Sequence, residues 1–155
     1  MKENVERTHR IAAGAIIIKD NKILLVRYHD NSGTTLLAAP GGAVKNEEGL
    51  SQAAVREVKE ETGIEIVPDK ILCVEDMYSR KYRMVKFWFL CQLVGGRLER
   101  TQGAIAETII EAKWYAKEEL KNEVVYPRII MESDWESFFR DNWQTKYLDL
   151  KYADF

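Results

Sequence analysis

The sequence predicts an α/β fold, a sandwich built on a mixed β-sheet, and three observations lead to this prediction. Segments rich in β-branched and aromatic residues recur along the chain, two other segments show helical periodicity, and strands lie before, between and after these helices. With 155 residues, of which 46% are hydrophobic, the chain can bury a substantial core. We therefore expect one compact domain over residues 1–155.

The N-terminal part is predicted to form a β-hairpin followed by a short strand. Residues 10–19 are rich in small and β-branched apolar residues, and residues 22–28 form a second apolar segment. The Asp-Asn pair at 20–21 favours a tight turn between them. A polar loop then leads to a short apolar segment, 35–39, which the Pro-Gly-Gly sequence at 40–42 ends.

A helix is predicted over residues 50–62. Gly49 can serve as its N-cap with Gln52 at the third helical position, and Gly63 can end it in the left-handed conformation that glycine tolerates. One side of the helix is apolar and includes Ala53, Ala54 and Val58. We therefore expect this side to pack against the core.

The C-terminal half is predicted to contain three more strands and a second long helix. The strands are expected over 71–79, 82–94 and 109–115, and a short helical turn over 117–120. Apolar residues recur at helical spacing over 128–142, which predicts an amphipathic helix.

Three glutamates on the first helix are the most informative feature of the chain. Glu57, Glu60 and Glu61 are spaced i, i+3 and i+4, so they lie on one helical face within roughly 100° of arc. Like charges on adjacent turns repel by about a few tenths of a kcal/mol per pair, which a cation would offset. Hard divalent ions prefer such oxygen ligands. The alternative, a solvated charged face, fits less well beside the apolar side of the helix.

The segment 42–64, GAVKNEEGLSQAAVREVKEETGI, resembles the Nudix box of the Nudix hydrolases. That box is a glycine, five residues, Glu, seven residues, and Arg-Glu-aliphatic-any-Glu-Glu-any-Gly-aliphatic. The residues at its specified positions are Gly42, Glu48, Arg56, Glu57, Val58, Glu60, Glu61, Gly63 and Ile64. The resemblance implies an α/β/α sandwich with a curved mixed sheet between helices, in which the box forms a loop-helix-loop unit.

The resemblance also implies roles for the residues of the box. Arg56 would orient the glutamate cluster, and Glu48 would hydrogen-bond Arg56 or reach the metal through water. Together with these two residues, Glu57 and Glu60 are the candidate catalytic residues of the box. The implied cofactor is Mg²⁺ or Mn²⁺, with ligands from Glu57, Glu60, Glu61 and the carbonyl oxygen of Gly41.

The catalytic base is left open by the resemblance. Some relatives use a glutamate of the box, and others use a carboxylate on a later loop. Here the loop between Gly95 and Thr108 offers Glu99 and Glu107. We select Glu107 because it stands just before a predicted strand, from which a loop carboxylate could reach back to the metals.

Residues downstream of the box bear on the choice of substrate. ADP-ribose pyrophosphatases tend to carry a proline downstream of the box, where this chain has Ser79 and Arg80. Dinucleoside polyphosphate hydrolases tend to carry a tyrosine slightly farther on, and Tyr82 stands eighteen positions after Ile64. Aromatic and arginine side chains can stack on a base and pair with phosphate. The candidate substrate-binding residues are Tyr78, Arg80, Tyr82 and Trp88.

Two classes of function are consistent with these residues. The favoured one is a metal-dependent hydrolase that cleaves a phosphoanhydride of a nucleoside diphosphate linked to another moiety. Its substrate would be a dinucleoside polyphosphate, a nucleoside triphosphate, a nucleotide sugar or ADP-ribose. The alternative is a non-catalytic Nudix-fold nucleotide sensor, which usually shows loss of these carboxylates. Isopentenyl diphosphate isomerase shares the fold but differs around its site.

Composition limits the partners. The net charge of −2 offers no general field for polyanions, so we expect no extended nucleic-acid surface. The two cysteines lack metal-ligand spacing and are expected to be reduced core thiols, as in a cytoplasmic protein. The apolar run 11–18 is too short to span a bilayer. Homodimerisation stays open, as does whether residues 148–155 pack on their own domain or on a partner.

Overall fold

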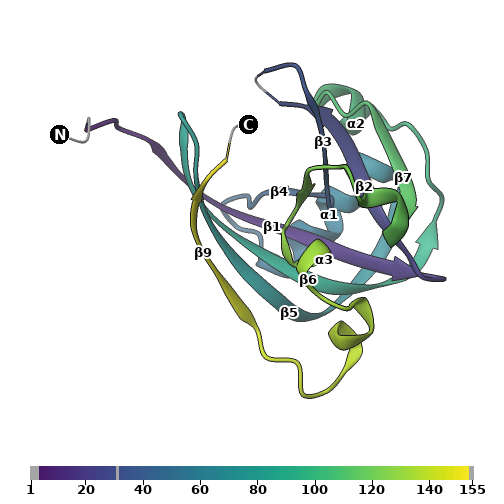
Figure 1. Cartoon of the computed structure of the whole chain (residues 1–155). Helices are drawn as coiled ribbons and strands as arrows, with labels where there is room; N and C mark the ends of the chain where they lie inside the picture. Colours follow the sequence, from purple (N-terminus) through teal and green to yellow (C-terminus); the bar gives the residue numbers. More distant parts are fainter. Residues whose placement is uncertain (1–3, 31, 154–155) are drawn as a thin grey trace.

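The computed structural model describes residues 4–30 and 32–153, whose strands form one curved mixed sheet (Figure 1). The sheet runs in the order β8-β3-β2-β1-β6-β5-β9, with β4 paired to β1 and β7 paired to β2. The strands are β1 (Thr8–Lys19), β2 (Lys22–His29), β3 (Thr35–Ala38), β4 (Gly41–Ala43), β5 (Ile64–Tyr78), β6 (Tyr82–Gly96), β7 (Glu111–Ala116), β8 (Val125–Tyr126) and β9 (Lys146–Tyr152).

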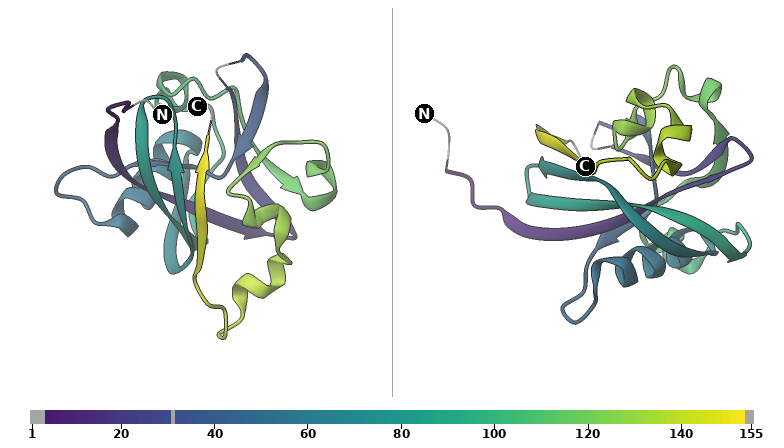
Figure 2. Two further views of the ribbon diagram at one scale, coloured as in Figure 1. Left: turned by 60° about the vertical axis from the view of Figure 1, so that its left-hand side comes forward. Right: turned by 90° about the horizontal axis from the view of Figure 1, so that it is seen from below.

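Helical elements lie on both faces of this sheet, which confirms the predicted sandwich (Figure 2). Helix α1 covers one face, and the short elements α3 and η2 cover the other. The helices and 3₁₀ turns are α1 (Leu50–Thr62), α2 (Gln102–Ala106), η1 (Lys117–Leu120), α3 (Ile129–Glu132) and η2 (Trp135–Phe139). The sheet is mixed because β1 pairs in parallel with β6, whereas β5 and β6 are antiparallel.

The predicted hairpin and box helix are both confirmed. Asp20 and Asn21 have φ angles of 51° and 60°, the left-handed values of the tight turn that joins twisted strands. Helix α1 has the expected bounds, and the N–H of Gly49 donates to Oε1 of Gln52 at 2.7 Å. Gly63 ends α1 with a φ of 80°, and its N–H donates to the carbonyl oxygen of Lys59. The local sequence therefore determines both ends of α1.

Strand β5 begins earlier than expected. The prediction began at residue 71, but β5 starts at Ile64, directly after the helix. Pro68 lies within the strand, where its missing N–H argues against strand. The structure accommodates it with register shifts against β6 between Pro68 and Cys73, which are β-bulges or similar irregularities.

The predicted helix over 128–142 is wrong. Two short elements, α3 and η2, occupy this segment, and Ser133 between them has extended φ and ψ angles of −116° and 151°. Asp134 then caps η2, because its side chain accepts a hydrogen bond from the N–H of Glu136. The apolar spacing therefore reflects core packing of two separate turns. The residues buried by these turns are Ile129, Ile130, Trp135 and Phe138.

Two apolar cores lie on the two faces of the sheet. The first joins the sheet to α3 and η2 and includes Ile16, Leu72, Trp88, Ile130 and Phe138. The second joins the sheet to α1 and includes Ala15, Ile17, Ala53, Ala54 and Val58. The cysteines Cys73 and Cys91 are buried as free thiols, and burial raises the pKa of Cys91 to about 12. No helix in the described ranges is long and apolar enough to span a membrane.

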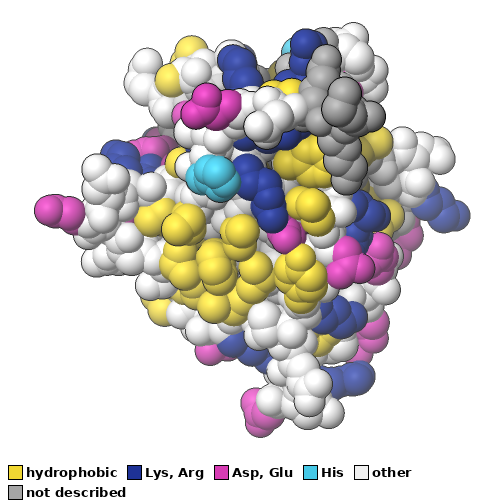
Figure 3. Space-filling view, turned by 90° about the vertical axis from the view of Figure 1, so that its left-hand side faces the viewer, with side chains coloured by type: hydrophobic (Ala, Val, Ile, Leu, Met, Phe, Trp, Pro, Cys, Tyr) yellow, Lys and Arg dark blue, Asp and Glu magenta, His cyan; other side chains and the backbone are white. Residues whose placement is uncertain are grey.

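The C-terminal strand packs on its own chain. β9 pairs in parallel with β5, and the N–H of Ala153 donates to the carbonyl oxygen of Tyr78 at 2.9 Å. This finding answers the question left open for the segment up to residue 153. Hydrophobic side chains gather on the face of the molecule that β9 borders (Figure 3). The exposed large hydrophobic residues include Ile11 of β1 and Tyr147 of β9, with 57% and 61% of their surface accessible.

Phe138 and Phe139 provide a test of the packing of η2. Phe138 is fully buried, with its ring 5.1 Å from that of Trp143, whereas Phe139 is 55% exposed. We expect Phe138→Ala to lower the free energy of unfolding by about 3–5 kcal/mol, because it leaves a core cavity. The matched control Phe139→Ala should change it by less than about 0.5 kcal/mol. Urea denaturation measures both values, and equal effects would contradict the packing described.

Candidate functional site

The candidate site is built where α1 meets the short strand β4. β4 pairs with β1 through Gly42 and Ala13, and the chain then passes through a loop into α1. A Cβ atom on Gly42 would lie 2.5 Å from the carboxylate carbon of Glu57. A Cβ atom on Gly41 would lie 2.6 Å from the carbonyl oxygen of Ala13. Both glycines are therefore needed for the helix and β1 to approach the β4 backbone this closely.

Arg56 connects the carboxylates of the site. Its Nε and Nη2 atoms donate to the two oxygens of Glu48 at 2.6 and 2.9 Å, a bidentate pair. Its Nη1 atom donates to Glu57 at 2.9 Å and to Glu60 at 3.1 Å. Its Nη2 atom also donates to the carbonyl oxygen of Ala43 at 3.0 Å, which ties α1 to the end of β4. One guanidinium thus fixes three carboxylates.

The Arg56 contacts change the acidity of Glu48. The hydrogen bonds from Arg56 lower the pKa of Glu48 from its ordinary value of 4.5 to about 2. The same contacts raise the pKa of Arg56. Glu48 therefore stays ionised throughout the physiological range of pH.

Glu61 lies apart from this group. It is only 6% exposed, and the N–H of Gly41 donates to its Oε2 atom at 3.3 Å. Burial raises the pKa of Glu61, and the nearby charge of Lys86 opposes this shift. Among residues 4–30 and 32–153, no three His, Cys, Asp or Glu side chains converge enough to hold a metal ion by themselves. Any ion held by these glutamates would thus need further ligands from substrate or water.

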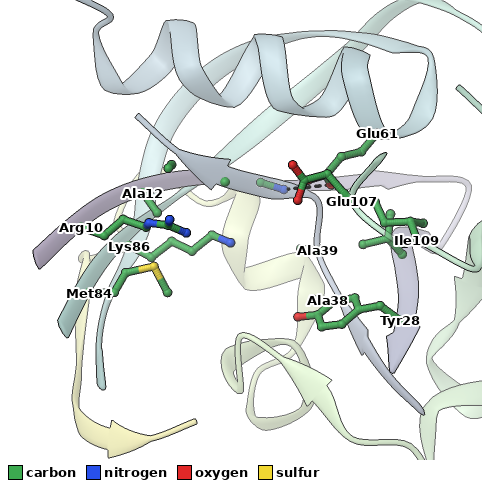
Figure 4. A pocket seen from close by; sticks show the side chains of 14 residues that line it. Arg10, Ala12, Tyr28, Ala38, Ala39, Glu61, Met84, Lys86, Glu107 and Ile109 are labelled. Carbon is green, nitrogen blue, oxygen red and sulfur yellow. Dashed lines mark hydrogen bonds between the residues drawn. The ribbon is translucent and has the colours of Figure 1, made fainter. Parts of the chain in front are cut away.

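A pocket of about 210 Å³ opens beside Glu61 (Figure 4). Arg10 and Lys86 extend into it from β1 and β6, and Glu61 and Glu107 lie on the opposite side. Other lining residues include Ala12, Tyr28, Ala38, Met84 and Ile109. The pocket thus has a cationic wall facing a wall of carboxylates.

Sequence reasoning missed the cationic wall. A single lysine within the apolar strand YRMVKFWFLC, at Lys86, was an available signal, because lysine is rarely buried without a partner. Arg10 carried no such signal, because it follows a charged N-terminal segment. Only the parallel pairing of β1 with β6 brings the two side chains together.

The two loop carboxylates considered as bases lie in different places. Glu107 ends α2 and lines the pocket together with Glu61. Glu99 lines a second pocket of about 300 Å³ on another side of Glu61. The hydroxyl of Thr101 donates to the carbonyl oxygen of Glu60, which holds α2 against α1. Glu107 therefore lines the pocket that contains Arg10 and Lys86, and Glu99 lines the second pocket.

The four candidate substrate-binding residues lie outside the lining of the pocket. Trp88 is only 1% exposed, with its Nε1 donating to Glu75 at 3.0 Å and the Nζ of Lys86 4.2 Å from its ring centroid. Its ring belongs to the core, which corrects the expectation that it stacks on a base. Tyr78, Arg80 and Tyr82 lie at the tip of the β5–β6 hairpin.

The family model for the NUDIX domain matches residues 8–132. This chain belongs to the Nudix family. The box glutamates, Arg56 and the two glycines of β4 all lie within the matched residues, and β9 lies beyond them.

Several proteins are similar to this Nudix chain. It is 37% identical over 94 residues to an ADP-ribose pyrophosphatase of Methanocaldococcus jannaschii, covering 57% of this chain and 54% of that protein. It is 32% identical over 119 residues to Nudix hydrolase 2 of Arabidopsis thaliana, and this match covers 75% of this chain and 42% of that protein. The chain thus spans about half the length, or less, of these relatives.

Solved structures support the Nudix fold. A MutT protein from Methanosarcina mazei has a TM-score of 0.65 at 28% identity, with 83% of this chain and 94% of that chain covered. An ADP-ribose pyrophosphatase from Streptococcus suis has a TM-score of 0.62 at 21% identity. The match covers 90% of this chain and 99% of that chain. The latter similarity speaks for the fold alone.

The ion pair between Glu48 and Arg56 predicts a defined pH dependence of stability. Because the folded-state pKa of Glu48 is lowered, its contribution is complete above about pH 4.5 and is lost as the pH falls toward 2. We expect Glu48→Gln to unfold at lower urea concentration than the unsubstituted protein at pH 7. This difference should shrink as the pH falls from about 4.5 to 2.

The exposed neighbour Glu47 offers a matched control, because Glu47→Gln removes the same charge without touching Arg56. Its urea midpoint should follow that of the unsubstituted protein at each pH. A constant difference for Glu48→Gln from pH 7 to 3 would contradict the ion-pair explanation.

Proposed function

We propose that this chain is a hydrolase that cleaves the phosphoanhydride of a nucleoside diphosphate linked to another moiety, with Mg²⁺ or Mn²⁺ as cofactor. The carrying observation is that the carboxylates fixed by Arg56 share helix α1 and its N-terminal loop with Glu61, which lines a pocket whose opposite wall is cationic. Phosphoanhydride hydrolysis needs both features, because anionic oxygens must be neutralised while water is held near phosphorus.

The donor set fits a hard divalent cation. Glu57, Glu60, Glu61 and the carbonyl oxygen of Gly41 supply oxygen atoms only, which Mg²⁺ and Mn²⁺ prefer. Glu57 and Glu61 are only 8% and 6% exposed, so their charges need compensation inside the protein. When bound, the metal supplies charge neutralisation for the phosphates and lowers the pKa of a bound water.

The remaining roles belong to side chains of the chain itself. Arg56 holds the oxygens of Glu57 and Glu60 in place, and Glu48 holds Arg56. In the reaction, the oxygen of a water attacks phosphorus, the bridging P–O bond breaks, and the water loses a proton. We assign that proton to the carboxylate of Glu107, which faces the pocket beside Glu61. A glutamate of the box is the competing choice.

Substrate identity is proposed only as a class. The similar proteins include an ADP-ribose pyrophosphatase and the human 8-oxo-dGDP phosphatase NUDT18, the latter 29% identical over 110 residues. ADP-ribose, nucleotide sugars, dinucleoside polyphosphates and oxidised nucleoside triphosphates therefore form the first screen, each with Mg²⁺ or Mn²⁺. Non-catalytic nucleotide binding, the competing function, would give binding without turnover in this screen.

Substitution of the box glutamates tests the proposed function. We expect Glu57→Gln and Glu60→Gln each to lower metal-dependent phosphate release by more than the about 10–100-fold typical of outer-shell changes. The reason is that each removes a negative oxygen donor while keeping the shape of the side chain. Turnover of the best substrate is the measurement, and circular dichroism checks that the variants are folded.

Glu47→Gln is the control for these variants, because Glu47 is exposed in the loop before α1, is not a hydrogen-bond partner of Arg56 and does not line the pocket. It should retain full turnover. Undiminished turnover in both folded glutamine variants would overturn the proposed function, and so would nucleotide binding without turnover by the unsubstituted protein.

A further inference from the structure

The polarised pocket suggests where a second phosphate would bind. Arg10 and Lys86 approach from β1 and β6, opposite Glu61 and Glu107 (Figure 4). The pocket volume of about 210 Å³ lies below the range of about 300–1,000 Å³ typical of pockets for whole drug-sized ligands. It therefore suits a compact anionic part of a ligand, with the remainder outside.

Lys86 lies against the core of the protein. It is the cross-strand partner of Glu75, which is only 6% exposed and accepts a hydrogen bond from Trp88. Burial lowers the pKa of Lys86, and the nearby charges of Glu61 and Glu75 oppose this shift. Within the described residues Lys86 forms no ion pair with a carboxylate, and its Nζ lies 4.2 Å from the ring centroid of the buried Trp88. Lys86 is thus held against the core.

Arg10 has a different environment. Its guanidinium lies over the ring of Tyr82, with 4.0 Å between Cζ and the ring centroid. Within the described part of the chain, Arg10 forms no ion pair with a carboxylate. Arg10 is exposed to solvent and also lines the pocket. The structure thus presents a planar cation, supported on one face by an aromatic ring, at the wall opposite the glutamates.

We propose that Arg10 binds the phosphate of the substrate that lies farther from the box glutamates, and that Tyr82 is the positioning residue that holds its guanidinium. This inference rests on the proposed function, which places the other phosphate at the glutamates. A guanidinium can bind a phosphate through two parallel hydrogen bonds. The pocket thereby selects compounds that carry two linked phosphates.

This assignment changes the role expected for Tyr82. Arg10 covers one face of its ring, so that face is not available for stacking on a base. Tyr82 instead acts through Arg10. The ring, and not the hydroxyl group, is the part that supports the guanidinium.

Titration with inorganic pyrophosphate in the presence of Mg²⁺ tests the proposal. We expect Arg10→Ala to weaken the affinity measured by calorimetry about 10- to 100-fold, the usual effect of losing hydrogen bonds to a charged group. Arg10→Lys keeps the charge but not the planar fork, and should give an intermediate loss. In kinetic assays KM should rise with kcat little changed, because the contact exists before and during reaction.

Tyr82 variants separate positioning from bulk packing. Tyr82→Phe keeps the ring and should retain the affinity for pyrophosphate. Tyr82→Ala removes the ring and should weaken that affinity about two- to fivefold, as expected for an exposed cation–π contact. The combination of Tyr82→Ala with Arg10→Ala should be no weaker than Arg10→Ala alone, because Tyr82 acts through Arg10.

Arg7 provides a matched control. It also lies over a tyrosine, with its Cζ 5.2 Å from the ring centroid of Tyr78, and its Nε donates to the carbonyl oxygen of Ser79. Arg7 does not line the pocket. Arg7→Ala should therefore leave pyrophosphate affinity unchanged, and an equal loss in Arg7→Ala and Arg10→Ala would indicate a general charge effect and overturn the proposal.

The failure of this proposal differs from failure of the proposed function. Unchanged pyrophosphate affinity in folded Arg10→Ala and Arg10→Lys would overturn the role of Arg10, even if Glu57→Gln abolishes turnover. Absence of pyrophosphate binding by the unsubstituted protein would overturn it as well. If no substrate is hydrolysed but pyrophosphate binding depends on Arg10 and not on Arg7, the hydrolase assignment fails and the role of Arg10 stands.

Discussion

The hydrogen bonds of Arg56 are the interaction on which the candidate site depends. A single planar cation contacts three carboxylates and the carbonyl oxygen of Ala43. Without it, Glu57 and Glu60 would repel each other one turn apart on α1. Arginine suits this place because its fork holds several oxygens at once and does not titrate. Its contact with Ala43 also makes the orientation of α1 depend on the end of β4.

A second constraint comes from the core beneath the pocket. A Cβ atom on Gly14 of β1 would lie 2.3 Å from the ring of Trp88, so β1 can pass over this ring only as glycine. The buried Trp88 fixes Glu75 through its indole N–H, and Glu75 stands across from Lys86 in the sheet. Core packing reaches the cationic wall of the pocket directly, because the Nζ of Lys86 lies 4.2 Å from the ring centroid of Trp88.

The parts of the structure that depend on local sequence could be predicted. The bounds of α1 follow from Gly49, Gln52 and Gly63, and the first hairpin follows from its Asp-Asn turn. The segment 128–142 shows the limit, because apolar spacing does not reveal that Ser133 leaves the helical conformation. The sequence of 128–142 predicts which of its side chains are buried. The backbone conformation of this segment depends instead on packing against the sheet.

The residues of the candidate site also differ in whether local sequence or long-range pairing brings them together. The box glutamates and Arg56 are at most a few helical turns apart, so spacing places them together. Arg10 and Lys86 are brought together only by the parallel pairing of β1 with β6, which no short pattern encodes. The burial of Trp88 could not be predicted for the same reason. An aromatic residue in a strand can face either the core or a ligand, and only the strand register decides which.

Strand β9 connects the part of the chain outside the matched residues to the tip of the β5–β6 hairpin. It lies beyond residues 8–132, yet it pairs with β5 up to the tip of the β5–β6 hairpin. There the rings of Tyr152 and Tyr78 meet edge to face at 5.4 Å, close to the strand start that carries Tyr82. Because the ring of Tyr82 lies against the guanidinium of Arg10, β9 packs on the same hairpin that contacts the cationic wall. The C-terminal strand thus packs against the hairpin from which the ring of Tyr82 contacts Arg10, a residue that lines the pocket.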